Sequence, residues 1–508
     1  MLNFISKITT MNTAQDIKAF FSYPRQDVVA GIVVFLVAIP LCLGIAIASG
    51  VSPISGLVAG IVGGIIVPLV SRSPLSVSGP AAGLISIVLM EIDRLGSIER
   101  FLSAVILAGA IQFLFGVCRT GKYAALVPSS VIKGMLAAIG ITIIIKQIPV
   151  ALGVTGGLGD ISAGFAMGPT IITVISLIIL YGWKRTPLAK FALLSPALVL
   201  VVLSSVLALM LRNAPSLALT PNQFVDVPLG GFSALASALP RPDFGAFMDK
   251  DIWIVAVTIA IVASIETLLS IQAIDRLDPL ERHSPPNREL LAQGIANALS
   301  GFLGGLPVTS VIVRSGANVS AGGRERLSAF VHGLLLLIAV VFAGTVLNAI
   351  PLACLAAVLI QVGLNLAKPS LFRMQAKLGA TQFLPFAITI AAVLGLDLLK
   401  GVIVGTVIGV MFVLHQNSKS VVVITRGENG AVQMKFRRDG TFLSKPKISV
   451  ALESIEDDST LEIVATGEFL DQDVKEMLTT FIHGANARRI TVRLVGVDLA
   501  GAAVGGGH

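Results

Sequence analysis

The stretch "GGLPVTSVIVRSGAN", from Gly304 to Asn318, stands between two apolar segments and is therefore expected at membrane depth. It nevertheless contains a proline, a hydroxyl pair (Thr309 and Ser310) and a full positive charge, Arg314. Charged residues inside a membrane are expensive and usually functional, and irregular backbone is tolerated there only where protein or a water-filled cavity surrounds it. The stretch therefore indicates a functional site inside a membrane protein.

The composition agrees with this interpretation. Of the 508 residues, 55% are hydrophobic and only 13% are charged, whereas soluble domains carry roughly 25% charged residues. The net charge of +8 would suggest nucleic-acid binding in a soluble protein, but membrane proteins collect Lys and Arg in their cytoplasmic loops. We therefore expect a polytopic protein that lies in the lipid bilayer and binds no nucleic acid.

Several polar residue types have unremarkable interpretations. Three cysteines (Cys42, Cys118 and Cys354) fall in apolar runs, and we expect buried small hydrophobes there. Gln112 and His332 occur singly on apolar segments and are interpreted as satisfied polar residues. Metal-ligand spacing, a phosphate loop and a nucleophile–base constellation are all missing from the sequence. We therefore expect no enzyme activity, no catalytic residues, no metal and no cofactor.

Apolar runs divide the chain into about fourteen segments, several of them shorter than the roughly 20 residues that a full span needs. An even number of crossings places both termini on one side, and the loops on that side hold about twice as many Lys and Arg as the opposite loops. This bias predicts a multi-pass protein of the cell inner (cytoplasmic) membrane with both termini in the cytoplasm. No cleavable signal peptide is expected.

Three regions follow from these patterns. We predict a cytoplasmic N-terminal segment (1–26), a transmembrane domain (27–418) in which residues 213–250 form an extended outside loop, and a small cytoplasmic α/β domain (419–508). In the last region "SVVVITRGENGAVQMKFRRDGTFLSK" alternates apolar and polar residues, as strands do. "DQDVKEMLTTFIHGANARR" then predicts an amphipathic helix, and "ITVRLVGV" a strand.

Two short segments interrupted by Gly and Pro occupy matching places in the two halves of the transmembrane domain. The first begins at Gly79-Pro80, and the second is the stretch around Thr309. Each follows a long apolar segment by about 40 residues, which is the pattern of an inverted repeat with a binding site near the midplane. The predicted fold class is therefore an all-α polytopic membrane protein of about fourteen segments, with a small C-terminal α/β domain.

The chemistry of these segments suggests an anion site. A helix that starts at membrane depth exposes free N–H groups and the positive end of its dipole, and two such ends facing each other favour an anion. Pro80 suits the first helical position, and Ser78, Thr309 and Ser310 can cap a helix or donate to a ligand. Arg314, one to two turns into the second helix, supplies a full charge. Alternatively, Arg314 snorkels or pairs with Glu266.

Glu266 is the acidic residue that lies well inside a long apolar segment, "IVASIETLLSIQ". Acids in such places commonly lie on proton or ion paths. We therefore expect a coupling or gating role for Glu266, and a structural hydrogen-bonded acid is the alternative.

Three blocks of this sequence resemble the sulfate permease (SulP) family of inorganic anion transporters, which includes bacterial bicarbonate and sulfate carriers. They are "DVVAGIVVFLVAIPLCLGIAIASGVSPISGLVAGIVGG" (27–64), "SVSGPAAG" (76–83) and "PNRELLAQGIANALSGFLGGLPVTSVIVRSGANVSAGGRERLSAFVHG" (286–333). "TLEIVATGEFLDQDVKEMLTTF" also resembles a degenerate STAS domain, the cytoplasmic module that usually ends these proteins.

The resemblance implies a 7+7 inverted repeat, shared with uracil permeases and divided into a substrate-carrying core and a gate. It also implies a homodimer, an elevator-like movement of the core and a cytoplasmic partner at the STAS-like domain. The substrate contacts that the family implies are Leu41, Ser78, Gly79, Ala81, Ser310, Val311 and Arg314. Pro80 and Thr309 complete the predicted substrate-binding set, and Glu266 matches the acid of the eighth segment.

The sequence also departs from the family. Sodium-coupled bicarbonate carriers of the family have Asp where Glu266 stands and Thr where Ile312 stands, so a sodium site is in doubt here. The STAS-like segment has "LDQD" in place of the usual Ser-containing loop, which puts regulation by phosphorylation in doubt.

The resemblance therefore predicts secondary active transport of sulfate or bicarbonate, coupled to protons. A passive anion channel or exchanger, a nucleobase carrier of the same fold and a membrane anchor that recruits a partner are the alternatives. Nucleobase carriers tend to hold the neutral base with acidic side chains, whereas the second short segment here offers Arg314.

Overall fold

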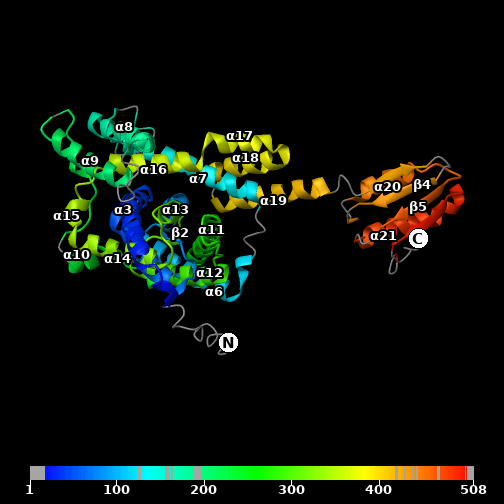
Figure 1. The fold of residues 1–508 in the computed structure, drawn as a ribbon, viewed down its shortest axis with the longest axis horizontal. Helices are drawn as coiled ribbons and strands as arrows, with labels where there is room; N and C mark the ends of the chain where they lie inside the picture. The colour runs from blue at the N-terminus through cyan, green and yellow to red at the C-terminus, as the bar shows by residue number, and fades with distance from the viewer. Residues whose placement is uncertain are drawn as a thin grey trace. The chain divides into compact units, whose positions relative to one another are not determined.

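Apolar helices build most of the computed structural model (Figure 1). Among the residues that the structure describes, six helices are long and apolar enough to cross a membrane by length and composition. They are α3 (Pro24–Ala48), α4 (Pro53–Val70), α6 (Ile98–Val117), α7 (Ser129–Ala151), α11 (Lys250–Asp275) and the segment Leu352–Lys377, which contains α16 (Leu352–Leu366) and α17 (Pro369–Lys377). Proline occupies the first turn of α3 and of α4, where its missing N–H leaves no hydrogen bond unmade.

Shorter apolar helices complete this part of the chain. They are α8 (Met167–Gly182), α9 (Pro196–Leu211), α14 (Leu327–Phe342), α18 (Ala380–Gly395) and most of α19 (Leu398–Asn417). The exact number of membrane segments stays a prediction. The structure describes residues 18–122, 128–154, 159, 161, 164–187, 196–214, 216–229, 231–396, 398–417, 422–427, 431–437, 439–441, 444–465, 469–497 and 499. Residues 1–17 of the predicted N-terminal segment lie outside the described residues.

Chain contacts divide the protein into two units. The first comprises Met1–Lys377 with Phe386–Val404, and the second comprises Leu378–Pro385 with Gly405–His508. Each unit has a hydrophobic core of its own.

The helices of the first unit pack in two groups. One group contains α3, α4, α6, α11, α14 and α12 (Pro286–Phe302), with α12 lying along α6 and α14 along α3 and α4. The other group contains α7, α8, α9 and α16, with α16 lying along α7 and α8. The two groups meet where α3 packs against α16, and there Leu359 of α16 lies directly beside Gly44 of α3.

The first group also holds the two interrupted segments. One consists of strand β1 (Ser78–Pro80), the 3-10 helix η1 (Ala82–Leu84) and α5 (Ile85–Leu95). The other consists of strand β2 (Val308–Ser310) and α13 (Ile312–Ser320). Figure 1 shows β2 and α13 in the middle of the bundle, beside α3 and α11. These short elements therefore lie inside the helix group, as their interrupted sequences indicate.

The second unit contains a four-stranded sheet. Its strands lie in the order β3 (Val422–Arg426), β4 (Ala431–Phe436), β5 (Thr460–Val464) and β6 (Thr491–Val495). The β3–β4 pair is antiparallel, whereas β4–β5 and β5–β6 are parallel. Parallel neighbours need crossover connections, and α20 (Lys445–Glu453) and α21 (Gln472–Ala485) lie in these connections. The predicted strands and amphipathic helix are present, whereas α20 and β5 were not assigned from the sequence.

Two local expectations were wrong. Residues 213–250 do not form an extended loop throughout, because α10 (Gly231–Ala238) and two 3-10 turns lie within the described part of this stretch. Proline and glycine are frequent there, but the run "GFSALASA" between them has enough helix-forming residues for two turns. Cys42 and Cys354 are buried free thiols as expected, but Cys118 is exposed because it caps the C-terminal end of α6.

Candidate functional site

A ladder of three residue pairs joins the two interrupted segments. Strands β1 and β2 run antiparallel, with Ser78 opposite Ser310, Gly79 opposite Thr309 and Pro80 opposite Val308. Because each strand leads directly into a short helix, the two helix starts lie at opposite ends of one short ladder. The two helix N-termini expected at one site are therefore brought together by a backbone pairing between strands from the two halves of the chain.

The start of each helix differs from the prediction. Pro80 is the last residue of β1 and not the first helical residue, because it pairs with Val308 in the ladder. The cap residues of η1, α5 and α13 are Ala81, Leu84 and Val311, and none of them caps with its side chain.

The serine and threonine hydroxyls do not cap the helices because they have other partners. Ser310 Oγ lies 2.6 Å from Ser76 Oγ, and Ser78 Oγ accepts a hydrogen bond from Gln293 at 2.6 Å. Thr309 Oγ1 donates to the carbonyl of Ser310 at 3.4 Å. Ser78, Thr309 and Ser310 are all buried.

The N-terminal end of α13 presents backbone donors. The first amide of this helix that donates within it belongs to Ser315, which bonds the carbonyl of Val311 at 3.0 Å. The preceding amides, those of Ile312, Val313 and Arg314, therefore have no partner within the helix. Since Ile312 and Val313 are exposed side chains, this helix end is open on one side.

Arg314 is the third residue of α13 and lies in its first turn, nearer to the helix start than predicted. Its side chain is 0% exposed, and among the described residues none of its three guanidinium nitrogens has a hydrogen-bond partner. Arg314 therefore neither snorkels nor pairs with Glu266. A buried, unpaired charge costs several kcal/mol, so this guanidinium calls for an anion that the described residues do not supply.

Small residues make room for the guanidinium. A Cβ atom added to Gly79 would overlap Arg314 Nη1, and one added to Gly60 would stand 3.9 Å from the same nitrogen. Cys42 lies close by, since a Cβ at Gly60 would also stand 2.6 Å from its sulfur. The guanidinium thus occupies a slot between α3, α4 and β1 that only glycine at position 79 leaves free.

His332 on α14 lies close enough to Arg314 for an electrostatic interaction between the two side chains. It is 0% exposed, and both ring nitrogens are without a hydrogen-bond partner among the described residues. The expectation of a satisfied histidine was therefore wrong. Gln112 is satisfied only in part, since its Oε1 accepts from Asn297 at 2.7 Å and its Nε2 has no partner within the described part of the chain.

Glu266 lies at the other helix start. Its carboxylate lies beside the backbone of Gly83, in η1. A Cβ added to Gly83 would stand 2.7 Å from one carboxylate oxygen and 2.9 Å from the other. The next residue, Thr267, accepts the N–H of Ser310 at 3.3 Å. One turn of α11 therefore contacts both interrupted segments.

The remaining predicted residues line the same region. Leu41 of α3 and Ala81 are buried, and Val311 is partly buried. Leu41 and Ala81 belong to the main hydrophobic core.

Sequence reasoning missed a row of polar residues on α12. Glu289, Gln293 and Asn297 are almost fully buried and follow one another at intervals of four residues, so they share one helix face. Gln293 donates to Ser78 in β1, whereas Asn297 both accepts from the Val308 N–H at 2.6 Å and donates to the Val308 carbonyl at 2.9 Å. Polar residues that recur every fourth position along this helix are the signal that could have identified them.

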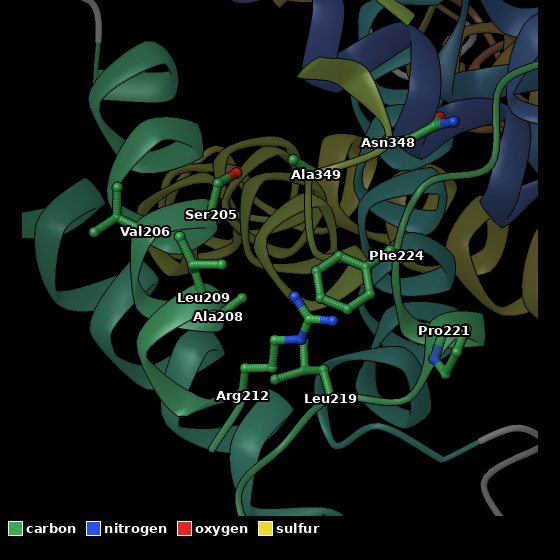
Figure 2. Close-up of a pocket in the computed structure, with 10 residues that line it drawn as sticks. All are labelled: Ser205, Val206, Ala208, Leu209, Arg212, Leu219, Pro221, Phe224, Asn348 and Ala349. Atoms are coloured by element: carbon green, nitrogen blue, oxygen red, sulfur yellow. The ribbon is translucent and has the colours of Figure 1, made fainter. Parts of the chain in front are cut away.

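A separate cavity of about 520 Å³ lies elsewhere, at the end of α9 (Figure 2). Figure 2 shows the guanidinium of Arg212 directed toward the ring of Phe224. Apolar side chains form most of its wall, and Arg212 is exposed. This cavity shares no lining residue with the slot around Arg314, so it is distinct from the paired helix starts.

Comparisons with known proteins show which family this chain resembles. Residues 25–392 match the sulfate permease family. The chain is 30% identical over 423 residues to "Putative sulfate transporter YbaR" of Bacillus subtilis (strain 168), covering 81% of this chain and 82% of that protein. It is 26% identical over 369 residues to "Bicarbonate transporter BicA" of Picosynechococcus, covering 69% of this chain and 63% of that protein.

Two solved structures share the fold. The transmembrane domain of a cyanobacterial bicarbonate transporter, BicA, aligns with a TM-score of 0.64 and 24% identity, covering 75% of this chain and 98% of that one. The structure of SLC26A9 aligns with a TM-score of 0.75 and 16% identity, covering 94% of this chain and 85% of that one. The predicted fold class, a helical membrane protein with a small C-terminal α/β part, is confirmed.

Proposed function

The chain belongs to the sulfate permease family of membrane transporters, and from this premise we propose that it performs secondary active transport of a small inorganic anion, sulfate or bicarbonate, across the cytoplasmic membrane. The observation that carries the proposal is the buried guanidinium of Arg314, which has no partner among the described residues. An anion placed before the start of α13 would compensate this charge and accept from the free helix amides. The names of the relatives, a sulfate transporter and a bicarbonate transporter, support the same class of substrate.

We assign binding to the predicted set around the ladder. Arg314 supplies charge, the start of α13 at Val311 supplies amides, and Ser78 and Ser310 supply hydroxyl groups. The remaining members (Leu41, Gly79, Pro80, Ala81 and Thr309) shape the site with small or apolar surfaces.

The position of Glu266 supports the proposed proton coupling. A charged carboxylate at Gly83 occupies the end of one of the two short helices, so it repels an anion that approaches the same region. Protonation removes that repulsion, and a bound anion in turn favours protonation, because linkage between two sites is reciprocal. Proton and anion are therefore expected to load together. Sodium is not expected to replace the proton, because Ile312 offers no oxygen ligand.

The two helix groups support an elevator-like mechanism. Every assigned binding residue lies in the group that contains α3, α4, α11 and α12, or in the segments held by it. In this proposal that group is the core and moves against the group of α7, α8, α9 and α16, which is the gate. We further propose that residues 27–418 form the transport domain of a homodimer, and that the cytoplasmic residues 1–26 and 419–508 flank it. The STAS-like part is proposed to bind a cytoplasmic partner.

The test is uptake of labelled sulfate and bicarbonate by proteoliposomes that contain the purified protein. The liposomes carry a proton gradient alone, a sodium gradient alone or neither. We expect saturable accumulation above equilibrium with the inward proton gradient only. Accumulation driven by sodium alone would overturn proton coupling, and equilibration without accumulation under every gradient would indicate a channel or exchanger. Uptake of labelled uracil in place of both anions would indicate a nucleobase carrier.

A further inference from the structure

A chain of hydrogen bonds runs from a buried acid on α12 to the first strand of the ladder. Glu289 is 0% exposed. One oxygen, Oε2, accepts from the hydroxyls of Ser71 and of Ser73, the latter at 2.7 Å. The other oxygen, Oε1, accepts from Gln293 Nε2 at 2.9 Å. The same Gln293 nitrogen also donates to Ser78 Oγ at 2.6 Å.

This chain has a fixed direction. A carboxylate that receives three donors acts only as an acceptor, so it requires the NH₂ end of the Gln293 amide on its side. The reversed amide would place a carbonyl oxygen against the carboxylate, which is repulsive. Both amide hydrogens are then used, one on Glu289 and one on Ser78, while Gln293 Oε1 has no partner among the described residues. The Gln293 amide thus uses both of its N–H donors even though its oxygen is left without a hydrogen bond. This arrangement shows that the Glu289 carboxylate sets the orientation of the amide.

The orientation of the Gln293 amide determines what the Ser78 hydroxyl can do. A hydroxyl has one proton to donate, and here its oxygen already accepts from Gln293. The hydrogen bonds found among the described residues include none in which Ser78 Oγ donates. Its proton is therefore available to a ligand at the ladder, next to Ser310 and on the strand whose Gly79 borders the Arg314 guanidinium.

We propose that Glu289 is a positioning residue of the anion site: through Gln293 it holds the Ser78 hydroxyl as a hydrogen-bond donor. The inference rests on the proposed anion transport and adds a determinant of substrate class to it. An oxyanion presents only acceptors and satisfies the donor, whereas a nucleobase edge that presents an N–H at the same place meets another donor. Selection for anions then comes from hydrogen-bond polarity as well as from the charge of Arg314.

The experiment measures initial rates of labelled sulfate and bicarbonate uptake by proteoliposomes at a series of anion concentrations. It compares the wild type with Glu289→Gln, Ser78→Ala and the double variant. The glutamine substitution keeps the size of the side chain but lets the Gln293 amide reverse, so the donor at Ser78 is no longer enforced. Loss of one hydrogen bond to a charged ligand predicts a KM roughly tenfold higher or more for each single variant, with a maximal rate per inserted molecule close to the wild-type value.

The double variant separates positioning from general structural support. If Glu289 acts through the Ser78 hydroxyl, the double variant has the KM of Ser78→Ala and no further loss. Ser300→Ala is the matched control, since it removes another buried hydrogen bond of α12, to the carbonyl of Leu306 at 2.6 Å. It should leave KM unchanged. Should Glu289→Gln fail to insert, Gln293→Met removes the same donor and should give the same KM and the same lack of additivity with Ser78→Ala.

Each other outcome overturns the proposal. A wild-type KM in Glu289→Gln, a lower maximal rate with unchanged KM, or losses that multiply in the double variant would show that Glu289 supports the fold without setting the hydroxyl. Absence of saturable anion uptake by the wild type would overturn the proposed function together with this inference. Normal wild-type uptake with an unaffected Glu289→Gln protein would overturn the inference alone.

Discussion

The carboxylate of Glu266 lies beside the backbone of Gly83, so an acid of α11 lies at the start of the first short helix. Arg314 belongs to the second short helix, and its guanidinium lies against Gly79 and Gly60 instead of against this acid. The two charges at membrane depth therefore serve separate helix ends. In the proposed mechanism, Arg314 binds the anion while Glu266 takes up a proton.

Replacement of Glu266 by Gln should separate exchange from accumulation. The amide is permanently neutral, so anion binding and exchange across the membrane should persist, whereas accumulation driven by a proton gradient should be lost. Uptake into proteoliposomes with and without an inward proton gradient measures both properties. Glu99→Gln changes an exposed acid in the first turn of α6 and should behave as the wild type. Proton-driven accumulation that survives in Glu266→Gln would contradict the coupling role.

Replacement of Arg314 by Gln should weaken anion binding and stabilise the anion-free protein. A hydrogen bond to a charged group is worth about 1.5–3 kcal/mol, so the affinity should fall roughly tenfold to a hundredfold. The unpaired buried charge is costly, so its removal should raise the thermal unfolding temperature in the absence of anion. Thermal unfolding with and without sulfate or bicarbonate measures both effects, since a ligand stabilises the state that it binds.

The matched control for that substitution is Arg212→Gln, which removes the arginine of the separate cavity (Figure 2). Because Arg212 is exposed, its removal should change neither the anion response nor the unfolding temperature by much. An Arg314→Gln protein that keeps wild-type affinity would show that the guanidinium does not bind the anion.

Substitution of Gly79 by Ala should act on Arg314 without changing any charge. The added Cβ would overlap Nη1 of Arg314, so the guanidinium must leave its slot, and we expect anion affinity to fall by roughly tenfold or more. Gly316→Ala is the control, because a Cβ there meets nothing within 4 Å. In the interior of α13 it should be neutral or stabilising by up to about 1 kcal/mol. Equal anion affinities in both alanine variants would rule out the slot as a determinant of binding.

Removal of the chain after Asn417 should leave transport intact. The strands and helices beyond this residue enclose a hydrophobic core of their own, which includes Met434, Phe436 and Leu461. Since the assigned site residues all precede residue 320, a measurable uptake rate per inserted molecule is expected. Complete loss of uptake by a well-folded truncated protein would show that the C-terminal part belongs to the transport machinery.

Local features of the sequence were sufficient to identify the class of protein and to find its charged residues at membrane depth. Low charge and long apolar runs follow from the hydrocarbon environment itself, which each segment experiences independently. The interrupted segments at Gly79 and Thr309 were also evident, because the Gly and Pro residues in and next to them disfavour a helix locally. Arg314 and Glu266 could be identified for the same reason, since a charge in an apolar run is conspicuous without any knowledge of its neighbours.

The partners of these residues were decided by tertiary structure. The Gln293–Ser78 hydrogen bond joins positions 215 residues apart, and the ladder pairs two strands from different halves of the chain. Such contacts depend on how α12 packs against α4 and α6, and side-chain spacing along one segment carries no information about that packing. For this reason the sequence indicated which residues carry charge. The fold alone determined that Arg314 and Glu266 do not pair and that Glu289 is connected to Ser78 through Gln293.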